Sequence, residues 1–173
     1  MAGKRYDCIA RLNGNTLEAI LFSACETFNK ECCGILLGKQ YSNILDINAA
    51  FAYQEIDRYQ KYVIYDNKKI KKIHEIVKNV GEEEILGEFH SHINDGNIKP
   101  LSPSSTDIEN MEIGNIEIIT TIWRKKRFRK LVMRKGIITG CFGNFFVRVA
   151  CFMKVGKKRY VRCPLQVKGL EVS

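Results

Sequence analysis

The chain has 173 residues, of which 45% are hydrophobic and 27% are charged, and its formal net charge at pH 7 is +9. The length suits one domain spanning residues 1–173, and the composition excludes a disordered or fibrous protein. The basic N-terminus lacks the apolar core of a signal peptide, and no apolar run reaches the roughly 18 residues of a membrane span, so no membrane contact and a cytoplasmic location are expected.

The N-terminal third of the chain predicts a helix followed by two strands. Residues 15–30 carry apolar side chains at helical spacing, and Asn15 or Thr16 is the expected helix cap. The short apolar run 32–38 and the segment 44–53 lie on either side of a polar turn, which indicates a pair of strands.

The segment 62–81 is predicted to contain a second amphipathic helix, with Asp66 or Asn67 as its cap and Gly81 as its stop. His74 lies on this lysine-rich helix and is expected to face solvent without a partner. The predicted inner stripe consists of Ile70, Ile73, Val77 and Val80.

The rest of the chain is predicted to be mainly β-structure. Residues 84–92 alternate as in a strand, a loop rich in Asn, Gly, Pro and Ser follows, and a short helix is expected to start at 104–107. Further strands are predicted at 116–123, 128–135, 144–155 and 159–167, separated by basic or glycine turns. This order of elements predicts an α/β fold with one curved mixed sheet flanked by helices.

Seven cysteines are scattered along the chain, at positions 8, 25, 32, 33, 141, 151 and 163. Their odd number and the absence of a C-x-x-C pair or a secretion signal do not predict a disulfide framework. We therefore expect all of them to remain reduced thiols.

The positive charge is concentrated late in the chain, in residues 123–130 and 157–162. A basic hairpin can bind an acidic protein partner or nucleic acid, and Trp123 and Phe128 offer aromatic rings for base stacking in the first of these segments. The alternative interpretation is a pair of solvated hairpin tips, in which lysine and arginine protect strand ends.

Two of the three histidines, His90 and His92, lie one residue apart in the predicted strand 84–92. In a strand, residues i and i+2 point to the same face about 6 to 7 Å apart, so both can bind one ion. Asp107, at the start of the predicted short helix, is the nearest suitable carboxylate for a third ligand. Two histidines and one aspartate leave the fourth zinc position for water, as in catalytic zinc sites.

Zinc lowers the pKa of a bound water toward about 7, and amide hydrolysis then needs a group that carries the proton. Glu31, between the first helix and the first strand, is the candidate general base. Taken alone, each feature has an ordinary explanation: His-x-His as plain strand residues, Glu31 as a surface acid, and Ser104-x-x-Asp107 as a helix-capping pattern.

Together these residues resemble the JAMM metalloprotease family, the MPN-plus proteins, in its prokaryotic JAB-domain type. The resemblance covers most of the chain and rests on three blocks in the family's order, Glu31-x-Cys33-Gly34-x-Leu36-x-Gly38, His90-Ser91-His92 and Pro103-Ser104-x-x-Asp107. It implies a single MPN-like, cytidine-deaminase-like domain that binds Zn²⁺ through His90, His92 and Asp107. It further implies that Glu31 is the acid/base and that Ser104 donates a hydrogen bond to the oxyanion.

The resemblance also implies a function, the hydrolysis of an isopeptide or peptide bond at the C-terminus of a ubiquitin-like or sulfur-carrier protein. Relatives often act as homodimers or within larger assemblies. The alternative within the same fold is a catalytically inactive scaffold that binds a partner. A zinc deaminase, whose fold is similar, is set aside because its His-x-Glu and Pro-Cys-x-x-Cys signature is missing.

Three positions depart from the family pattern. Ile93 follows His92 where relatives usually have proline, and the loop before Asp107 is about four residues longer than usual. The extra segment, 94–99 or part of it, is expected to shape the substrate groove. Glu88 lies on the same predicted strand face as the two histidines, where it is expected to be either a hydrogen-bond partner of a histidine or a competing carboxylate.

Overall fold

The computed structural model describes residues 8–54, 57–58, 63–64, 67–81, 83–93, 101–125 and 128–171. The helices in these ranges are α1 (Gly14–Glu26), α2 (Asn67–Val80) and α3 (Ser105–Asn110). The strands are β1 (Ile9–Leu12), β2 (Cys33–Tyr41), β3 (Ile44–Ala52), β4 (Asp57–Arg58), β5 (Val63–Ile64), β6 (Glu84–Ile93), β7 (Ile116–Arg124), β8 (Val132–Arg134), β9 (Ile137–Phe142), β10 (Phe145–Gly156), β11 (Arg159–Cys163) and β12 (Leu165–Val167). No described helix is long and apolar enough to cross a membrane.

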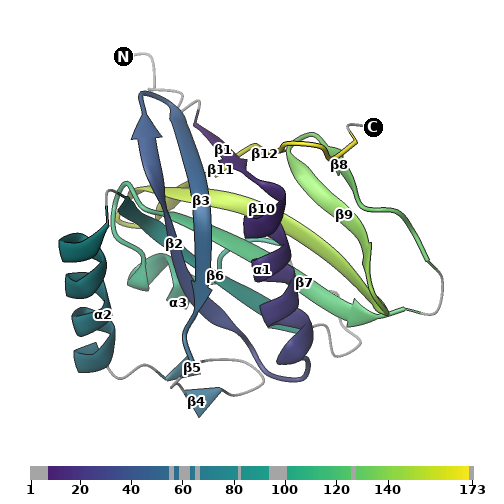
Figure 1. The fold of residues 1–173 in the computed structure, drawn as a ribbon, viewed down its shortest axis with the longest axis horizontal. Coiled ribbons are helices and arrows are strands. Elements are labelled where there is room, and N and C mark those ends of the chain that lie inside the picture. The colour runs from purple at the N-terminus through teal and green to yellow at the C-terminus, as the bar shows by residue number, and fades with distance from the viewer. Residues whose placement is uncertain are drawn as a thin grey trace.

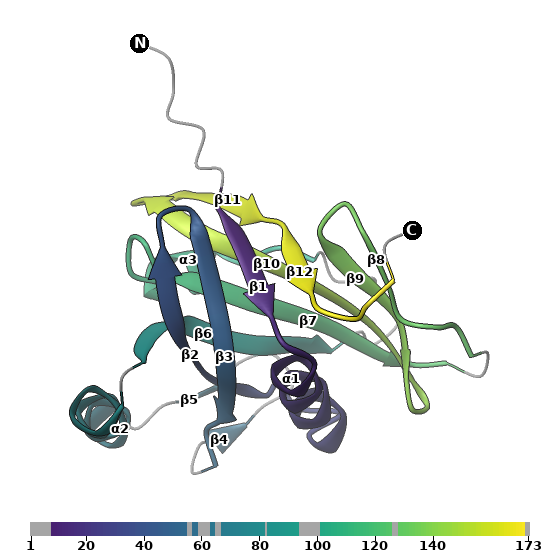
Figure 2. The same ribbon diagram turned by 45° about the horizontal axis from the view of Figure 1, so that its top comes forward.

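Within the described residues, ten strands form one curved mixed sheet with the order β12-β1-β3-β2-β6-β7-β10-β9-β8, and β11 pairs with β10 (Figure 1). The pairs β6–β7, β1–β3 and β1–β12 are parallel, and the others are antiparallel. Because β11 leads directly into β12, the sheet curls until it is nearly a barrel, as Figure 2 shows. The predicted α/β architecture with one curved sheet flanked by helices is confirmed.

Both faces of the central strand β6 are covered, because helices pack on both sides of the sheet. The larger core lies on the face of α1 and includes Phe89 of β6, together with buried α1 residues Leu17, Ile20, Leu21 and Ala24. The smaller cluster lies on the opposite face, where Val77 of α2 packs against Cys33 and Tyr53. Since side chains alternate along a strand, His90 and His92 lie on the α2 face of β6.

The two long helices differ from the predicted ones at their N-terminal ends. Asn13, rather than Asn15 or Thr16, caps α1, since its side-chain oxygen accepts a hydrogen bond from the Thr16 N–H. Asn67 is the first residue of α2 rather than its cap, and Asp66 lies outside the described residues.

The inner stripe of α2 is rotated from the predicted one. Ile73 is 37% exposed, whereas His74 is half-buried and Val77 packs on the sheet. The side chains of Ile70 and Val80 lie outside the described part of the chain. The prediction that His74 faces solvent is therefore wrong.

The described β-structure differs from the predicted one in several segments. β1 and β9 are strands that the sequence analysis did not predict. β1 is only four residues long, and the glycines around β9 are typical of turns. The predicted strand 159–167 is divided into β11 and β12 at Pro164, which has no N–H to donate to a ladder. The predicted strand 128–135 is reduced to the three residues of β8.

A disulfide joins Cys8 to Cys163, with their Cα atoms 5.2 Å apart. The expectation that every cysteine stays reduced is therefore wrong for this pair. The physical reason is strand pairing: Ala10 and Leu165 are register partners in β1 and β12, so the residues two positions before each also lie side by side. A sequence separation of 155 residues hides this proximity.

Candidate metal centre

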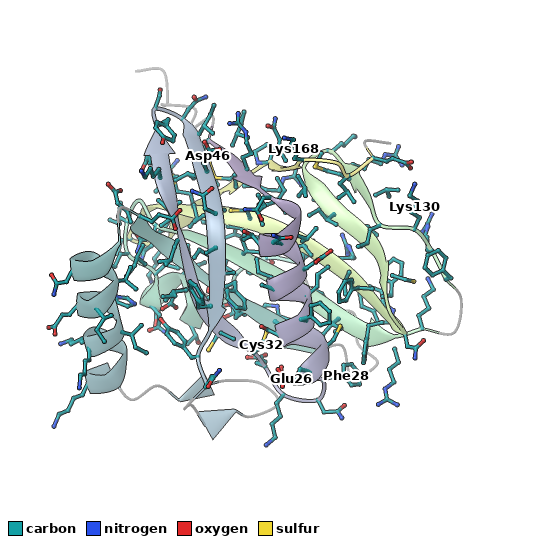
Figure 3. The ribbon with its side chains drawn as sticks, in the orientation of Figure 1. Glu26, Phe28, Cys32, Asp46, Lys130 and Lys168 are labelled. Carbon is teal, nitrogen blue, oxygen red and sulfur yellow. A yellow bond between two sulfur atoms is a disulfide. The ribbon has the colours of Figure 1, made fainter. Side chains whose placement is uncertain are left out.

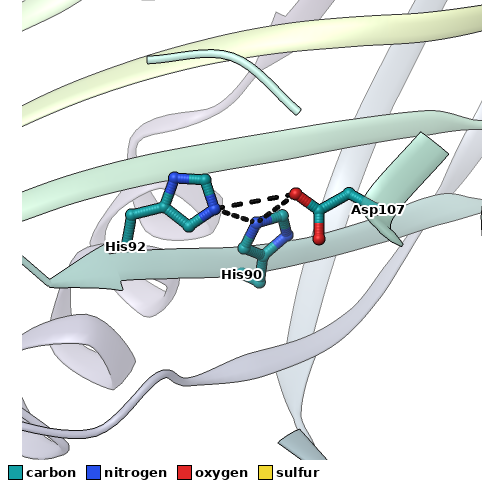
Figure 4. A group of neighbouring side chains, drawn as sticks. All are labelled: His90, His92 and Asp107. Carbon is teal, nitrogen blue, oxygen red and sulfur yellow. Dashed lines mark hydrogen bonds and ion pairs between the residues drawn. The ribbon is translucent and has the colours of Figure 1, made fainter. Parts of the chain in front are cut away.

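Three side chains from β6 and α3 converge on one point on the α2 face of the sheet (Figure 4). His90 Nε2 lies 2.9 Å from His92 Nε2, and Asp107 Oδ2 lies 3.6 Å from the former and 3.7 Å from the latter. The nearest point that is equidistant from the three atoms lies in their plane, about 2.0 Å from each, which is the length of zinc–nitrogen and zinc–oxygen bonds. The donor set therefore fits a metal ion.

The tautomer of His90 leaves its Nε2 atom available as a ligand. His90 Nδ1 lies 2.7 Å from Glu117 Oε1, and because a carboxylate only accepts, Nδ1 is the protonated nitrogen. In the neutral ring Nε2 then carries a lone pair. It faces His92 and the Asp107 carboxylate, so two ring nitrogens and a carboxylate oxygen surround one point that a cation could occupy.

The electrostatics of the group favour positive charge at this point. Burial alone would lower the pKa of His90, but the carboxylates of Glu117, Asp107 and Glu31 raise that pKa to about 9. Burial would raise the pKa of Asp107, but a hydrogen bond from His92, the charge of His90 and the Ser104 backbone hold it below its usual range. A proton or a metal ion can supply the charge that these carboxylates favour.

Asp107 is held in place by the first turn of α3. Ser104 is the N-cap of α3, and its N–H donates to Asp107 Oδ2 at 2.6 Å while the Asp107 N–H donates to Ser104 Oγ at 3.2 Å. This is the predicted capping pattern. At the other end of α3, the buried Lys154 donates from Nζ to the Met111 carbonyl at 2.6 Å and so fixes the helix to β10.

Glu31 lies in the turn between α1 and β2 and is only 7% exposed. The next residue is fixed to β6, because the Cys32 N–H donates to Ser91 Oγ at 2.9 Å and the Ser91 N–H donates to the Cys32 carbonyl at 3.0 Å. Figure 3 shows Cys32 close to the end of α1. Glu31 lines the same cavity as His90, Ser104 and Asp107, so the structure brings the predicted site residues together.

The carboxylate that accepts a hydrogen bond from His90 is Glu117 of β7, which the sequence analysis missed. Glu88 instead accepts a hydrogen bond at 3.2 Å from the Tyr53 hydroxyl, and burial followed by the charge of Glu117 raises the pKa of Glu88. The available signal was a glutamate inside the apolar run 116–123, since an acid in a buried strand needs a partner.

His74, for which no partner was predicted, lies 3.4 Å through Nε2 from the Tyr53 hydroxyl. Burial, followed by the nearby Lys78, lowers the pKa of His74. The ring therefore lines the same cavity as a neutral group at pH 7.

Two predicted features lie wholly or partly outside the described residues. The predicted insertion at 94–99 lies wholly outside the described residues. In the basic segment 123–130, residues 126–127 lie outside them. In the described part of that segment, Arg124 lies over the Phe28 ring at 5.3 Å and Lys125 over the Phe146 ring at 4.3 Å. These two charges thus pack on aromatic rings of the protein itself.

Replacing Glu117 with alanine is expected to weaken zinc binding by about 10- to 100-fold, because the imidazole of His90 loses the acceptor that orients it. The Glu117→Gln variant keeps an oxygen that accepts from Nδ1 and should recover most of the affinity. A titration against a chromophoric zinc chelator measures both constants. Equal affinities for wild type and Glu117→Ala would contradict the role of this hydrogen bond.

Comparisons with known proteins found a matching family model and a solved structure with a similar fold. The family model described as prokaryotic homologs of the JAB domain matches residues 14–132. The fold is similar to the solution structure of protein DSY2949 from Desulfitobacterium hafniense, with a TM-score of 0.66 and 16% sequence identity over 95% of this chain and 96% of that one. Among curated proteins none matches the sequence. On the extent of the family match, the chain belongs to the prokaryotic JAB-domain family.

Proposed function

We propose that the protein is a zinc-dependent hydrolase that cleaves an amide bond. The observation that carries the proposal is the convergence of His90, His92 and Asp107 on one point. Two of these residues, His90 and Asp107, line a cavity together with Glu31 and Ser104. The three converging residues would hold the metal. A zinc ion there supplies the Lewis acidity and the lowered water pKa that amide hydrolysis near neutral pH requires.

The remaining two residues have the chemistry for proton transfer and charge stabilisation. Glu31 is a buried carboxylate in the cavity wall and would accept a proton from the attacking water and pass it to the leaving amine. The Ser104 side chain accepts a hydrogen bond from the Asp107 N–H and lies against the Asp107 carboxylate, and its O–H would turn from that carboxylate to the negative oxygen that develops on the attacked carbonyl.

The proposed substrate is the C-terminal amide of a ubiquitin-like or sulfur-carrier protein, on the basis of family membership. The JAMM-type activity and the cytidine-deaminase-like relationship of the fold are part of the same proposal. The intact set of converging ligands favours this proposal over an inactive scaffold of the same fold.

The test uses ubiquitin-like and sulfur-carrier proteins fused through their C-terminal residues to a reporter. The zinc-loaded protein is expected to release the reporter at the last residue of the carrier, as measured by mass spectrometry. Removal of zinc with a chelator should abolish release, and added zinc should restore it. A zinc-loaded protein that cleaves none of these fusions would favour the scaffold alternative.

A further inference from the structure

The cavity that contains the metal centre continues beyond it, toward α2. Its volume is about 430 Å³, and His74 and Lys78 of α2 line it together with Met111 and Glu112, which follow α3. Within the sheet, Glu88 of β6 contributes to the lining. Because Glu88 precedes His90 by two residues in the same strand, its side chain points to the same face about 6 to 7 Å from the histidine.

Two carboxylates lie side by side in this part of the cavity. Glu88 and Glu117 are register partners in the parallel strands β6 and β7, which brings their side chains onto the same face about 4.8 Å apart. Like charges in such a pair repel each other. A positively charged group placed between them would remove this repulsion.

Each of the two carboxylates has one oxygen engaged by the protein. The Tyr53 hydroxyl donates to Glu88 Oε1, and His90 Nδ1 donates to Glu117 Oε1. Glu117 is only 7% exposed, yet its Oε2 has no hydrogen-bond partner among the described residues. A buried carboxylate oxygen without a donor, on a residue that lines a cavity, points to a ligand that brings a donor.

The whole cavity is negatively charged, like the pair Glu88 and Glu117. Among the described residues, its lining includes the carboxylates of Glu31, Glu88, Asp107, Glu112 and Glu117. Lys78 is the one lysine among the described lining residues, and burial lowers the pKa of His74 so that its ring adds no charge at pH 7. A dication at the metal centre leaves an excess of negative charge. This contrasts with the net charge of +9 of the chain and would attract a cation into the cavity.

The lining also offers apolar surface beside the carboxylates, through Ile85, Met111 and Ile116. A ligand with an aliphatic stem and a charged head matches such a mixture, because the stem packs on apolar side chains while the head meets the acids. Lysine-like side chains have this form.

We infer that the part of the cavity next to Glu88 and Glu117 binds the ammonium group of an aliphatic side chain, carried by a substrate residue adjacent to the hydrolysed amide. That the bound group belongs to a substrate rests on the proposed function, whereas the binding of the cation does not. Glu88 is the residue whose replacement tests this site, since a change at Glu117 would also remove the hydrogen bond to His90.

The experiment compares two probes, Nα-acetyl-lysine N-methylamide and the norleucine analogue, which differ by the ammonium group. Both are titrated into the ¹⁵N-labelled full chain, without metal and with zinc, and amide chemical shifts in β6 and β7 report binding. The lysine probe is expected to bind at least about tenfold tighter than the norleucine probe, because a hydrogen bond to a charged group contributes enough binding free energy for a change of this size.

Three variants locate the binding. Glu88→Gln, which keeps the side-chain shape, should reduce the lysine preference to within about twofold. Glu109→Gln is the matched control, because Glu109 is exposed on α3 and outside the described cavity lining. Lys78→Gln should tighten lysine binding by removing a competing cation, a gain that misfolding cannot produce.

Equal binding of the two probes to the wild type, or a preference that survives in Glu88→Gln, would overturn the inference. Cleavage assays on the same samples separate it from the proposed function. A protein that cleaves but shows no lysine preference contradicts the cation site alone. A protein that prefers lysine but cleaves nothing contradicts the hydrolase alone.

Discussion

Replacing Glu31 with glutamine is expected to lower kcat by about 100- to 10,000-fold while leaving zinc content unchanged. Glutamine has nearly the same shape as glutamate but cannot take up a proton from water at neutral pH. Glu31 is buried in the wall of the cavity and does not belong to the group of converging ligand atoms, so its loss should remove proton transfer and spare metal binding.

The measurement pairs turnover of a cleaved carrier fusion with elemental analysis of the same sample. Glu26→Gln is the matched control, since Glu26 is an exposed glutamate at the end of α1 and lies outside the described lining of the cavity. Normal turnover in Glu31→Gln would remove Glu31 from the mechanism. Loss of zinc in that variant would instead make Glu31 a metal ligand.

Replacing either His90 or Asp107 with alanine is expected to weaken zinc binding by on the order of 1,000-fold, so that purified protein falls from one zinc per chain to almost none. Each substitution removes one of the three candidate ligand atoms that, among the described residues, face the common point. In His90→Ala the two remaining atoms belong to His92 and Asp107, whose separation of 3.7 Å still spans an ion but leaves it open to solvent.

Elemental analysis without added metal measures this loss, and circular dichroism checks that the variants remain folded. His74→Ala is the control, because it removes the same imidazole group from the same cavity but not from the converging triad. Zinc retained in both His90→Ala and Asp107→Ala would rule out the proposed centre, as would a wild-type protein that takes up no zinc at all.

The sequence predicted the parts of the site that depend on local geometry. The alternation of residues along β6 places His90 and His92 on one face, and the capping pattern of Ser104 and Asp107 places the carboxylate at the first turn of α3. Both patterns operate over two or three residues, where the backbone geometry of strands and helices leaves little choice.

The features that the sequence did not predict depend on which strands become neighbours. Glu117 meets His90 because β7 pairs in parallel with β6, and Cys8 meets Cys163 because β1 pairs with β12. The partners are 27 and 155 residues apart, and strand order across a sheet is set by the packing of the whole core. Periodicity within one segment carries no information about such partners.

The rotation of α2 has a similar cause. Counting apolar residues predicted a stripe of isoleucines and valines, but the structure turns His74 inward and leaves Ile73 37% exposed. Tyr53 and Glu88 offer polar partners on the sheet surface beneath the helix, and the imidazole meets the Tyr53 hydroxyl there. A polar site on one face of a sheet thus changes which face of the covering helix is buried.

The link between Cys8 and Cys163 closes almost the whole described chain into a covalent ring. Every residue of the metal centre and of the acidic cavity lies inside this ring. A protease that cuts any single peptide bond within it would convert the protein to two fragments that migrate together on a gel until a reductant is added. The two cut pieces would also stay tethered at the paired strands β1 and β12, so the nicked protein can refold as one unit.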